Sequence, residues 1–299
     1  MYIPMRDGDS LHVSVIGSGQ PVLMLPGLTM ASWQWLVFVL PHTRRFRFYM
    51  PDFRGHGASR HARLNQTDVF ENHAQDVADV IAHLKLDDFL LAGISLGATT
   101  AMHLQRDGHL GQVKRYLHID QSPCVLNQPD WRYGLAGEKQ EQLIPLMQAV
   151  LAALEPHAYL DHFADLPPRI RWQLLKTFAP IFELLGISPM QQTLIRQALS
   201  LPTPLLRRVA LLRLQDLIAY LRAYSGGGHD YRANMAACTI PTTVFAGARS
   251  ALYAPQGQRL LTPDPARDRF VLFARSGHVP LLNEPLPFHR EFSRFLQDR

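Results

Sequence analysis

Short apolar runs alternate with segments of helical periodicity along the first half of the chain. The clearest helical segment spans residues 69–84, where Val77, Val80, Ile81 and Leu84 recur three or four positions apart. Short runs of mostly apolar residues predict strands at 2–6, 11–16, 22–25, 46–50, 89–92 and 115–119. Strands that alternate with helices predict a mostly parallel sheet with helices on both faces.

The pattern changes near Pro123 and returns only in the last quarter of the chain. Between residues 127 and 237 the sequence is rich in leucine and helical in period, and Ser188-Pro189 and Thr203-Pro204 each predict a helix start. Strands are predicted again at 242–246 and 270–273, with helices at 256–261 and 286–296. We therefore expect an α/β core of residues 1–126 and 238–299, with eight strands, and an all-helical cap, residues 127–237, after the sixth strand.

Composition excludes several classes of protein. The chain has 299 residues, of which 47% are hydrophobic and 18% charged, so it is neither a disordered chain nor a coiled coil. Its two cysteines, Cys124 and Cys238, cannot build a disulfide framework, and no spacing predicts a structural metal site. The net charge of +5 is spread along the chain. Without a nucleic-acid motif, the run Arg44, Arg45, Arg47 predicts a solvated turn and no nucleic-acid partner.

The apolar segment from Pro21 to Leu40 is long enough to raise the question of a membrane span. Pro26-Gly27 interrupts it after four apolar residues, which favours a strand, a turn and a short helix. The N-terminal residues do not form a secretory signal. We expect a cytoplasmic protein without a membrane span.

The segment Gly93-Ile-Ser95-Leu-Gly97 follows a predicted strand and precedes a predicted helix. This is the context of the G-x-S-x-G pattern, in which serine occupies a strained strand-to-helix turn and its hydroxyl stands exposed above the sheet. An unactivated serine hydroxyl is a poor nucleophile and needs a general base. Ser95 is therefore a candidate nucleophile.

Three further segments carry candidate chemistry. Leu25-Pro-Gly27-Leu28 ends the third strand, where the N–H of Leu28 can face a developing oxyanion together with the N–H of Leu96. Asp52-Phe-Arg-Gly-His-Gly-Ala-Ser59 follows the fourth strand, and Ser276-Gly277-His278 follows the last strand. Together with the serine turn, these segments resemble the α/β-hydrolase fold superfamily over nearly the whole chain. The resemblance implies His278 as the base and the helical segment as a cap.

The acid of the expected triad departs from the common pattern of this superfamily. Relatives usually carry an aspartate a few residues after the seventh strand, and Ser250 stands at that position here. Asp120 instead ends the sixth strand, and some α/β-hydrolases carry their acid there. We expect Asp120 to be the acid and Ser250 to contribute little. His118, the other candidate base, is more consistent with a packed strand residue.

These residues predict a serine hydrolase that cleaves a carboxylic ester, lactone or thioester through an acyl-enzyme. No metal and no organic cofactor are implied. The cap favours a small-molecule substrate with an apolar acyl or ring part, and Trp131 is a candidate substrate-binding residue. Two alternatives remain open: a cofactor-free C–C bond hydrolase with the same triad, and a non-hydrolytic ligand receptor on a hydrolase fold.

Overall fold

A computed structural model describes residues 1–201, 203–209 and 213–298 of the chain. Its centre is an eight-stranded sheet in the order β1-β2-β4-β3-β5-β6-β7-β8. The strands are β1 (Tyr2–Pro4), β2 (Ser10–Gly17), β3 (Gln20–Leu25), β4 (Phe46–Pro51), β5 (Phe89–Ile94), β6 (Val113–Ile119), β7 (Thr242–Gly247) and β8 (Arg269–Phe273). Strand β2 pairs antiparallel with β1 and β4, and all other pairs are parallel. The predicted mostly parallel sheet is confirmed.

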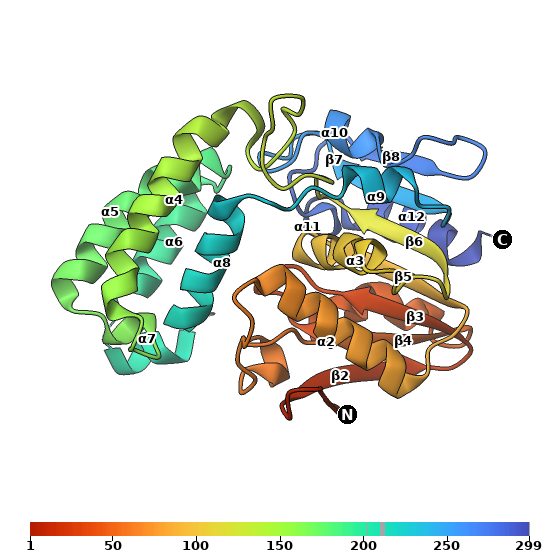
Figure 1. Ribbon diagram of the computed structural model, residues 1–299, viewed down its shortest axis with the longest axis horizontal. Helices are drawn as coiled ribbons and strands as arrows, with labels where there is room; N and C mark the ends of the chain where they lie inside the picture. Colours follow the sequence, from red (N-terminus) through yellow and green to blue (C-terminus); the bar gives the residue numbers. More distant parts are fainter. Residues whose placement is uncertain (202, 210–212, 299) are drawn as a thin grey trace.

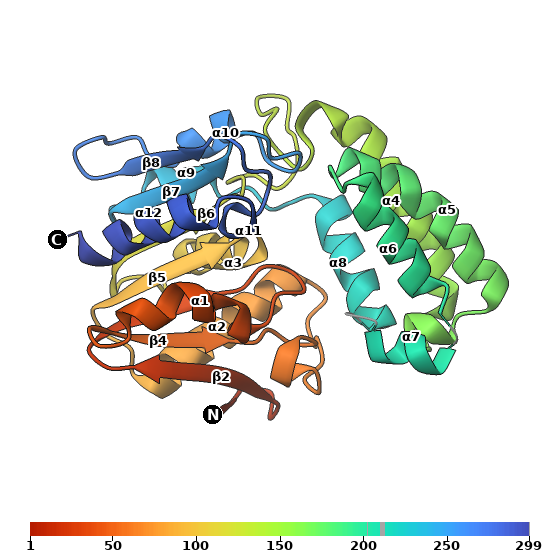
Figure 2. The ribbon, with the colours of Figure 1, turned by 180° about the vertical axis from the view of Figure 1, so that it is seen from behind.

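Helices cover both faces of the sheet (Figure 1, Figure 2). One face carries α2 (Val69–Leu84), α3 (Leu96–Arg106) and α9 (Arg232–Ala236). The other carries α1 (Leu36–Val39), α11 (Pro280–Asn283) and α12 (Pro285–Gln297), and α10 (Pro255–Arg259) follows β7. Short 3₁₀ turns lie at η1 (Ser32–Trp35), η2 (Leu40–His42), η3 (Gly57–Ser59), η4 (Gly137–Lys139), η5 (Glu155–His157) and η6 (Phe163–Asp165).

Strand β5 shows why the central strands are continuous runs of apolar residues. All six of its residues are buried, because helices cover both faces. Leu91 belongs to the cluster under α2 and α3, while its neighbour Leu90 belongs to the cluster on the opposite face, which also contains the phenylalanines of α12. The two-residue period of a strand therefore divides one run between two cores.

A separate group of helices lies to one side of the sheet layers in Figure 1. We call it the helical insert, and it consists of α4 (Gln140–Leu154), α5 (Pro168–Leu184), α6 (Pro189–Leu199), α7 (Thr203–Val209) and α8 (Leu214–Gly226). It has its own apolar cluster, which includes Leu143 and Ile218. Ser188 caps α6 in a capping box with Gln191, as its position before proline predicts, whereas α7 begins at Thr203 itself.

Helix α9 lies within the range predicted for the cap, yet its Met235 packs in the cluster beneath α2 and α3. The chain has thus returned to the sheet before residue 237. Both cysteines are buried and free. Within the described part of the chain, no helix is both long and apolar enough to cross a membrane.

Candidate active site

Ser95 sits at the junction of β5 and α3 in a strained backbone conformation, with φ 51° and ψ −116°. Glycines flank it because there is no room for a side chain. A Cβ on Gly93 would lie 2.5 Å from the carbonyl oxygen of Gly97, and one on Gly97 would lie 2.4 Å from that of Leu25. Tight packing around the turn maintains this strained backbone conformation. Strained backbone conformations are common at functional sites.

His278 lies in the loop between β8 and α11, and its ring lies beside Ser95. Its Nε2 is 2.9 Å from Ser95 Oγ, within reach for transfer of the hydroxyl proton. The loop approaches β7 so closely that a Cβ on Gly247 would lie 2.0 Å from the carbonyl oxygen of Gly277. This contact brings the histidine to the carboxyl ends of the central strands.

Asp120 lies directly after β6 with a φ of 45°, and its side chain is completely buried. Its Oδ2 is 2.7 Å from His278 Nδ1. Ser95, His278 and Asp120 therefore form a continuous hydrogen-bonded chain in the order required of a nucleophile, a base and an acid. The structure thus brings together the three residues that the sequence selected for the triad.

Three further groups donate hydrogen bonds to the Asp120 carboxylate. Oδ1 accepts from the backbone N–H of Gly247 at 2.8 Å and from Gln258 Nε2 at 3.1 Å, while Oδ2 also accepts from Ser250 Oγ at 2.7 Å. Ser250, expected to contribute little, is thus in direct contact with Asp120. Gln258 was missed altogether, because a single glutamine on a short helix carries no sequence signal.

The turn after β3 lies beside Ser95. A Cβ on Gly27 would be only 3.7 Å from the Cβ of Ser95, and Thr29 adopts a φ of 65°. Leu96 is the first residue of α3, so its N–H has no partner within the helix. In the described part of the chain, the N–H of Leu28 donates no hydrogen bond either. Both amides are available to an oxyanion.

Two other histidines, His118 and His56, are held by structural contacts. His118 is fully buried, with Nε2 bonded to the backbone oxygen of Gln121 and Nδ1 to the Tyr116 hydroxyl. Burial lowers the pKa of His118 to about 4, so its ring is neutral at physiological pH. His56 is buried too, and its Nδ1 bonds the backbone oxygen of Arg54.

A cavity of about 820 Å³ opens beside Ser95 and His278. Its walls come from the core and from the helical insert, and they are mostly apolar. Met147, Leu217, Leu221 and Tyr224 are among the insert's contributions. Among the described residues, no Asp, Glu, Lys or Arg lines the cavity. Its size and lining suit a largely apolar small molecule.

Trp131 does not line this cavity. The side chain is buried against the ring of Tyr133, with centroids 5.2 Å apart, and Arg232 lies 5.1 Å above its ring. The structure therefore does not bring Trp131 together with the other predicted site residues.

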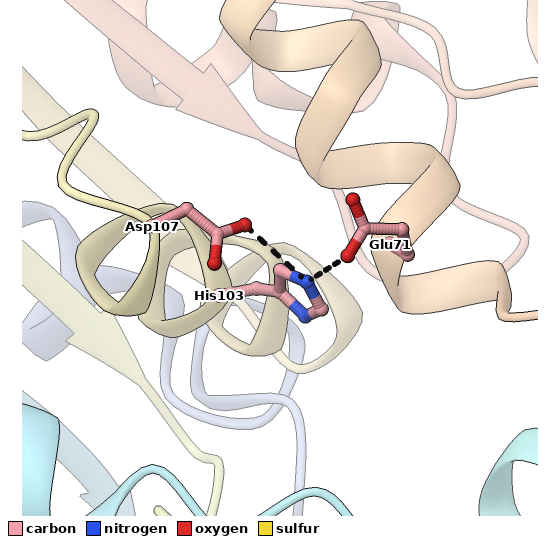
Figure 3. A group of neighbouring side chains, drawn as sticks. All are labelled: Glu71, His103 and Asp107. Atoms are coloured by element: carbon pink, nitrogen blue, oxygen red, sulfur yellow. Dashed lines mark hydrogen bonds and ion pairs between the residues drawn. The ribbon is translucent and has the colours of Figure 1, made fainter.

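A second cluster of titratable side chains joins α2 to α3 (Figure 3). Glu71 Oε2 and Asp107 Oδ2 lie 2.8 and 3.6 Å from Nε2 of the buried His103. Arg106 Nη2 lies 3.1 and 3.3 Å from the same two carboxylate oxygens. The guanidinium already supplies the positive charge, so we interpret the cluster as an ion-pair network between two helices.

Comparison with known proteins identifies the family of this chain. The model of the alpha/beta hydrolase family matches residues 22–291. A pimeloyl-[acyl-carrier protein] methyl ester esterase of Nitrosomonas europaea is 24% identical over 93% of this chain and 96% of its own length. An esterase from Exiguobacterium antarcticum has a TM-score of 0.73 at 22% identity, over 100% of this chain and 99% of its own. An enol-lactonase from Burkholderia xenovorans has a TM-score of 0.68 at 17% identity, with 100% of both chains covered. The chain belongs to the alpha/beta hydrolase family.

Proposed function

We propose that this protein hydrolyses carboxylic esters through an acyl-enzyme formed on Ser95. The observation that carries the proposal is the hydrogen-bonded chain from Ser95 Oγ through His278 to Asp120, at 2.9 and 2.7 Å. Ser95 and His278 lie on the wall of a cavity large enough for a small ester. A relative that is a methyl ester esterase supports the same reaction class.

The first half of the reaction uses His278 as a general base. Its Nε2 takes the proton as Ser95 Oγ attacks the carbonyl carbon, and Asp120 stabilises the imidazolium that forms. The N–H groups of Leu28 and Leu96 donate to the oxyanion of the tetrahedral intermediate. The imidazolium then returns the proton to the leaving alkoxide, which departs as an alcohol.

Water completes the cycle. His278 accepts a proton from a water molecule that attacks the acyl carbon, and the second tetrahedral intermediate collapses to a carboxylic acid and free Ser95. Because the cavity walls are mostly apolar, we assign it esters with an apolar acyl or ring part. Lactones fit the same mechanism, with the alcohol retained in the product.

Ser95→Ala tests the proposal. The variant should lose ester hydrolysis by roughly 10⁵-fold or more while its melting temperature stays near that of wild type, because the hydroxyl serves the reaction. A fluorophosphonate probe should label wild type at Ser95 and leave the variant unlabelled. Retained turnover in Ser95→Ala, or labelling of another serine, would contradict the assignment. A protein that binds esters without releasing product would be a receptor.

A further inference from the structure

We propose that Gln258 is a positioning residue that holds the Asp120 carboxylate toward His278, an inference that rests on the proposed triad. Gln258 lies on α10, its side chain is completely buried, and its Nε2 donates to Asp120 Oδ1 at 3.1 Å. With the backbone N–H of Gly247 on the same oxygen, it fixes the plane of the carboxylate.

The contacts of Gln258 determine which way its amide points. Its Nε2 also lies 3.1 Å from the backbone carbonyl oxygen of Tyr253, and both of its partners are acceptors only. The –NH₂ group must therefore face them. The opposite orientation would place the amide oxygen against a carboxylate and a carbonyl, which is repulsive.

This orientation leaves the other half of the amide without a partner. Among the described residues, Gln258 Oε1 is buried and accepts no hydrogen bond. An orphaned acceptor destabilises the folded state. A residue selected only for stability would not leave this group unpaired, so the observation points to a role for the donor.

The role follows from the chemistry of Asp120. A fully buried carboxylate must keep its charge, and it must keep Oδ2 aimed at His278 Nδ1 throughout the proton transfers. Oδ2 is shared between His278 and Ser250, so the orientation of the group depends on what holds Oδ1. Removing Gln258 leaves one donor on Oδ1, the backbone N–H of Gly247, which allows the carboxylate to rotate.

The first test replaces Gln258 with methionine, which has a similar length and no donor. In Gln258→Met we expect kcat to fall about 10-fold at unchanged KM, since a hydrogen bond to a charged group is lost. We expect only a small change in melting temperature, because the orphaned oxygen is removed while the carbonyl oxygen of Tyr253 loses its donor. A kcat within twofold of wild type would overturn the proposal.

Gln140→Met is the matched control. Gln140 is a buried glutamine of the helical insert with both halves paired: its Nε2 donates to Leu135 O and its Oε1 accepts from Asn127 N. Its replacement should lower the melting temperature and leave kcat unchanged. If Gln258→Met behaves in the same way, Gln258 is structural and the proposal is wrong.

Gln258→Glu keeps the shape of the side chain. It therefore tests the proposal even if Gln258→Met does not fold. At low pH the protonated carboxyl can still donate to Asp120, whereas at high pH it becomes an anion that repels it. The loss of kcat relative to wild type should therefore deepen as the pH rises. A loss that does not vary with pH would contradict the proposal.

The Asp120→Asn background separates this inference from the proposed function. Without the Asp120 carboxylate, Gln258→Met should have no further effect on kcat, because the two residues act through one contact. An equal loss in both backgrounds would overturn the positioning role and leave the triad standing. If Asp120→Asn itself retains full activity, the proposed triad fails first.

Discussion

The sheet core and the helical insert bury their apolar residues in different ways. Every residue of β5 and β7 is buried, and the two faces of the sheet carry separate clusters. In the insert, by contrast, α6 has no buried residue, and Met190 and Leu194 on it are 73% and 58% exposed. The central strands of the core are packed from two sides, whereas this outer helix of the insert is packed from one side only.

The core and the insert also make different contributions to the candidate site. The core supplies Ser95, Asp120 and His278, each at the end of a strand or just beyond one, where the backbone cannot shift without disturbing the sheet. The insert supplies apolar side chains to the cavity wall and none of the three residues of the proposed triad. We therefore expect changes in the core to affect the chemistry and changes in the insert to affect substrate choice.

The largest expected effect is that of Asp120→Asn. The new amide would present a donor to His278 Nδ1 and favour the wrong tautomer, so kcat should fall by on the order of 10⁴-fold. Steady-state kinetics on a chromogenic ester would measure it. The fold should persist, because Gly247 N and Gln258 Nε2 can still donate to the remaining side-chain oxygen, and the Ser250 hydroxyl can accept from the new amide. Near wild-type activity would show that the acid lies elsewhere.

The core could be predicted from sequence because burial on two faces leaves a strong signal. Residues 69–84 were predicted as a helix and are α2, and each of the eight predicted strands overlaps an observed one. The triad could be proposed because each member follows a strand in a recognisable short segment. Because Ser250 stands where relatives usually carry an aspartate, Asp120 became the candidate acid. Its carboxylate lies 2.7 Å from His278 Nδ1.

The surroundings of the site could not be predicted in the same way. Gln258 meets Asp120 only because α10 packs beside the end of β6, a contact between residues 138 positions apart. Trp131 was selected as a large aromatic residue in the insert, but nothing local reveals that its ring packs against Tyr133 and Arg232. Long-range packing decides which side chains line a cavity, and a single sequence does not encode it in a readable pattern.

A buried acid at the junction of the two regions predicts pH-dependent stability. Asp216 on α8 is 3% exposed, its Oδ2 has no partner among the described residues, and burial raises its pKa to about 6. An acid with a raised pKa stabilises the fold most when protonated, below its unfolded value of about 3.9. That contribution is lost as the pH rises through about 6. Above this pH the ionised carboxylate lowers the free energy of unfolding by on the order of 2–3 kcal/mol relative to the protonated form.

Asp216→Asn removes this ionisation. The difference in unfolding free energy between the variant and wild type should shift in favour of the variant from pH 4.5 to pH 8. Urea unfolding of both proteins at the two pH values would measure it. Asp76→Asn is the control: burial raises the pKa of Asp76 to about 6 as well, but its carboxylate is paired with Arg54 at 2.6 Å. Breaking that pair should destabilise the protein at pH 8. If Asp216→Asn and wild type show the same dependence on pH, Asp216 is not the titrating group.

The smallest expected effect concerns the walls of the cavity and sharpens the comparison between the regions most directly. Met147 on α4 lines the cavity, so Met147→Ala should enlarge it and change the ratio of kcat/KM between long and short acyl chains by about 10-fold. Leu143, one turn earlier and fully buried in the insert's own cluster, provides the control. Leu143→Ala should lower stability by about 2–5 kcal/mol and leave the ratio unchanged.

Trp131→Ala completes this series of ester profiles. Because its ring lies outside the cavity lining, its loss should reduce kcat/KM for every ester by the same factor, in line with the fraction of protein that remains folded. A changed ranking of substrates in Trp131→Ala, together with an unchanged ranking in Met147→Ala, would reverse the assignment. The cavity wall would then be formed by the loop before α4, because the helices of the insert would have no influence on substrate choice.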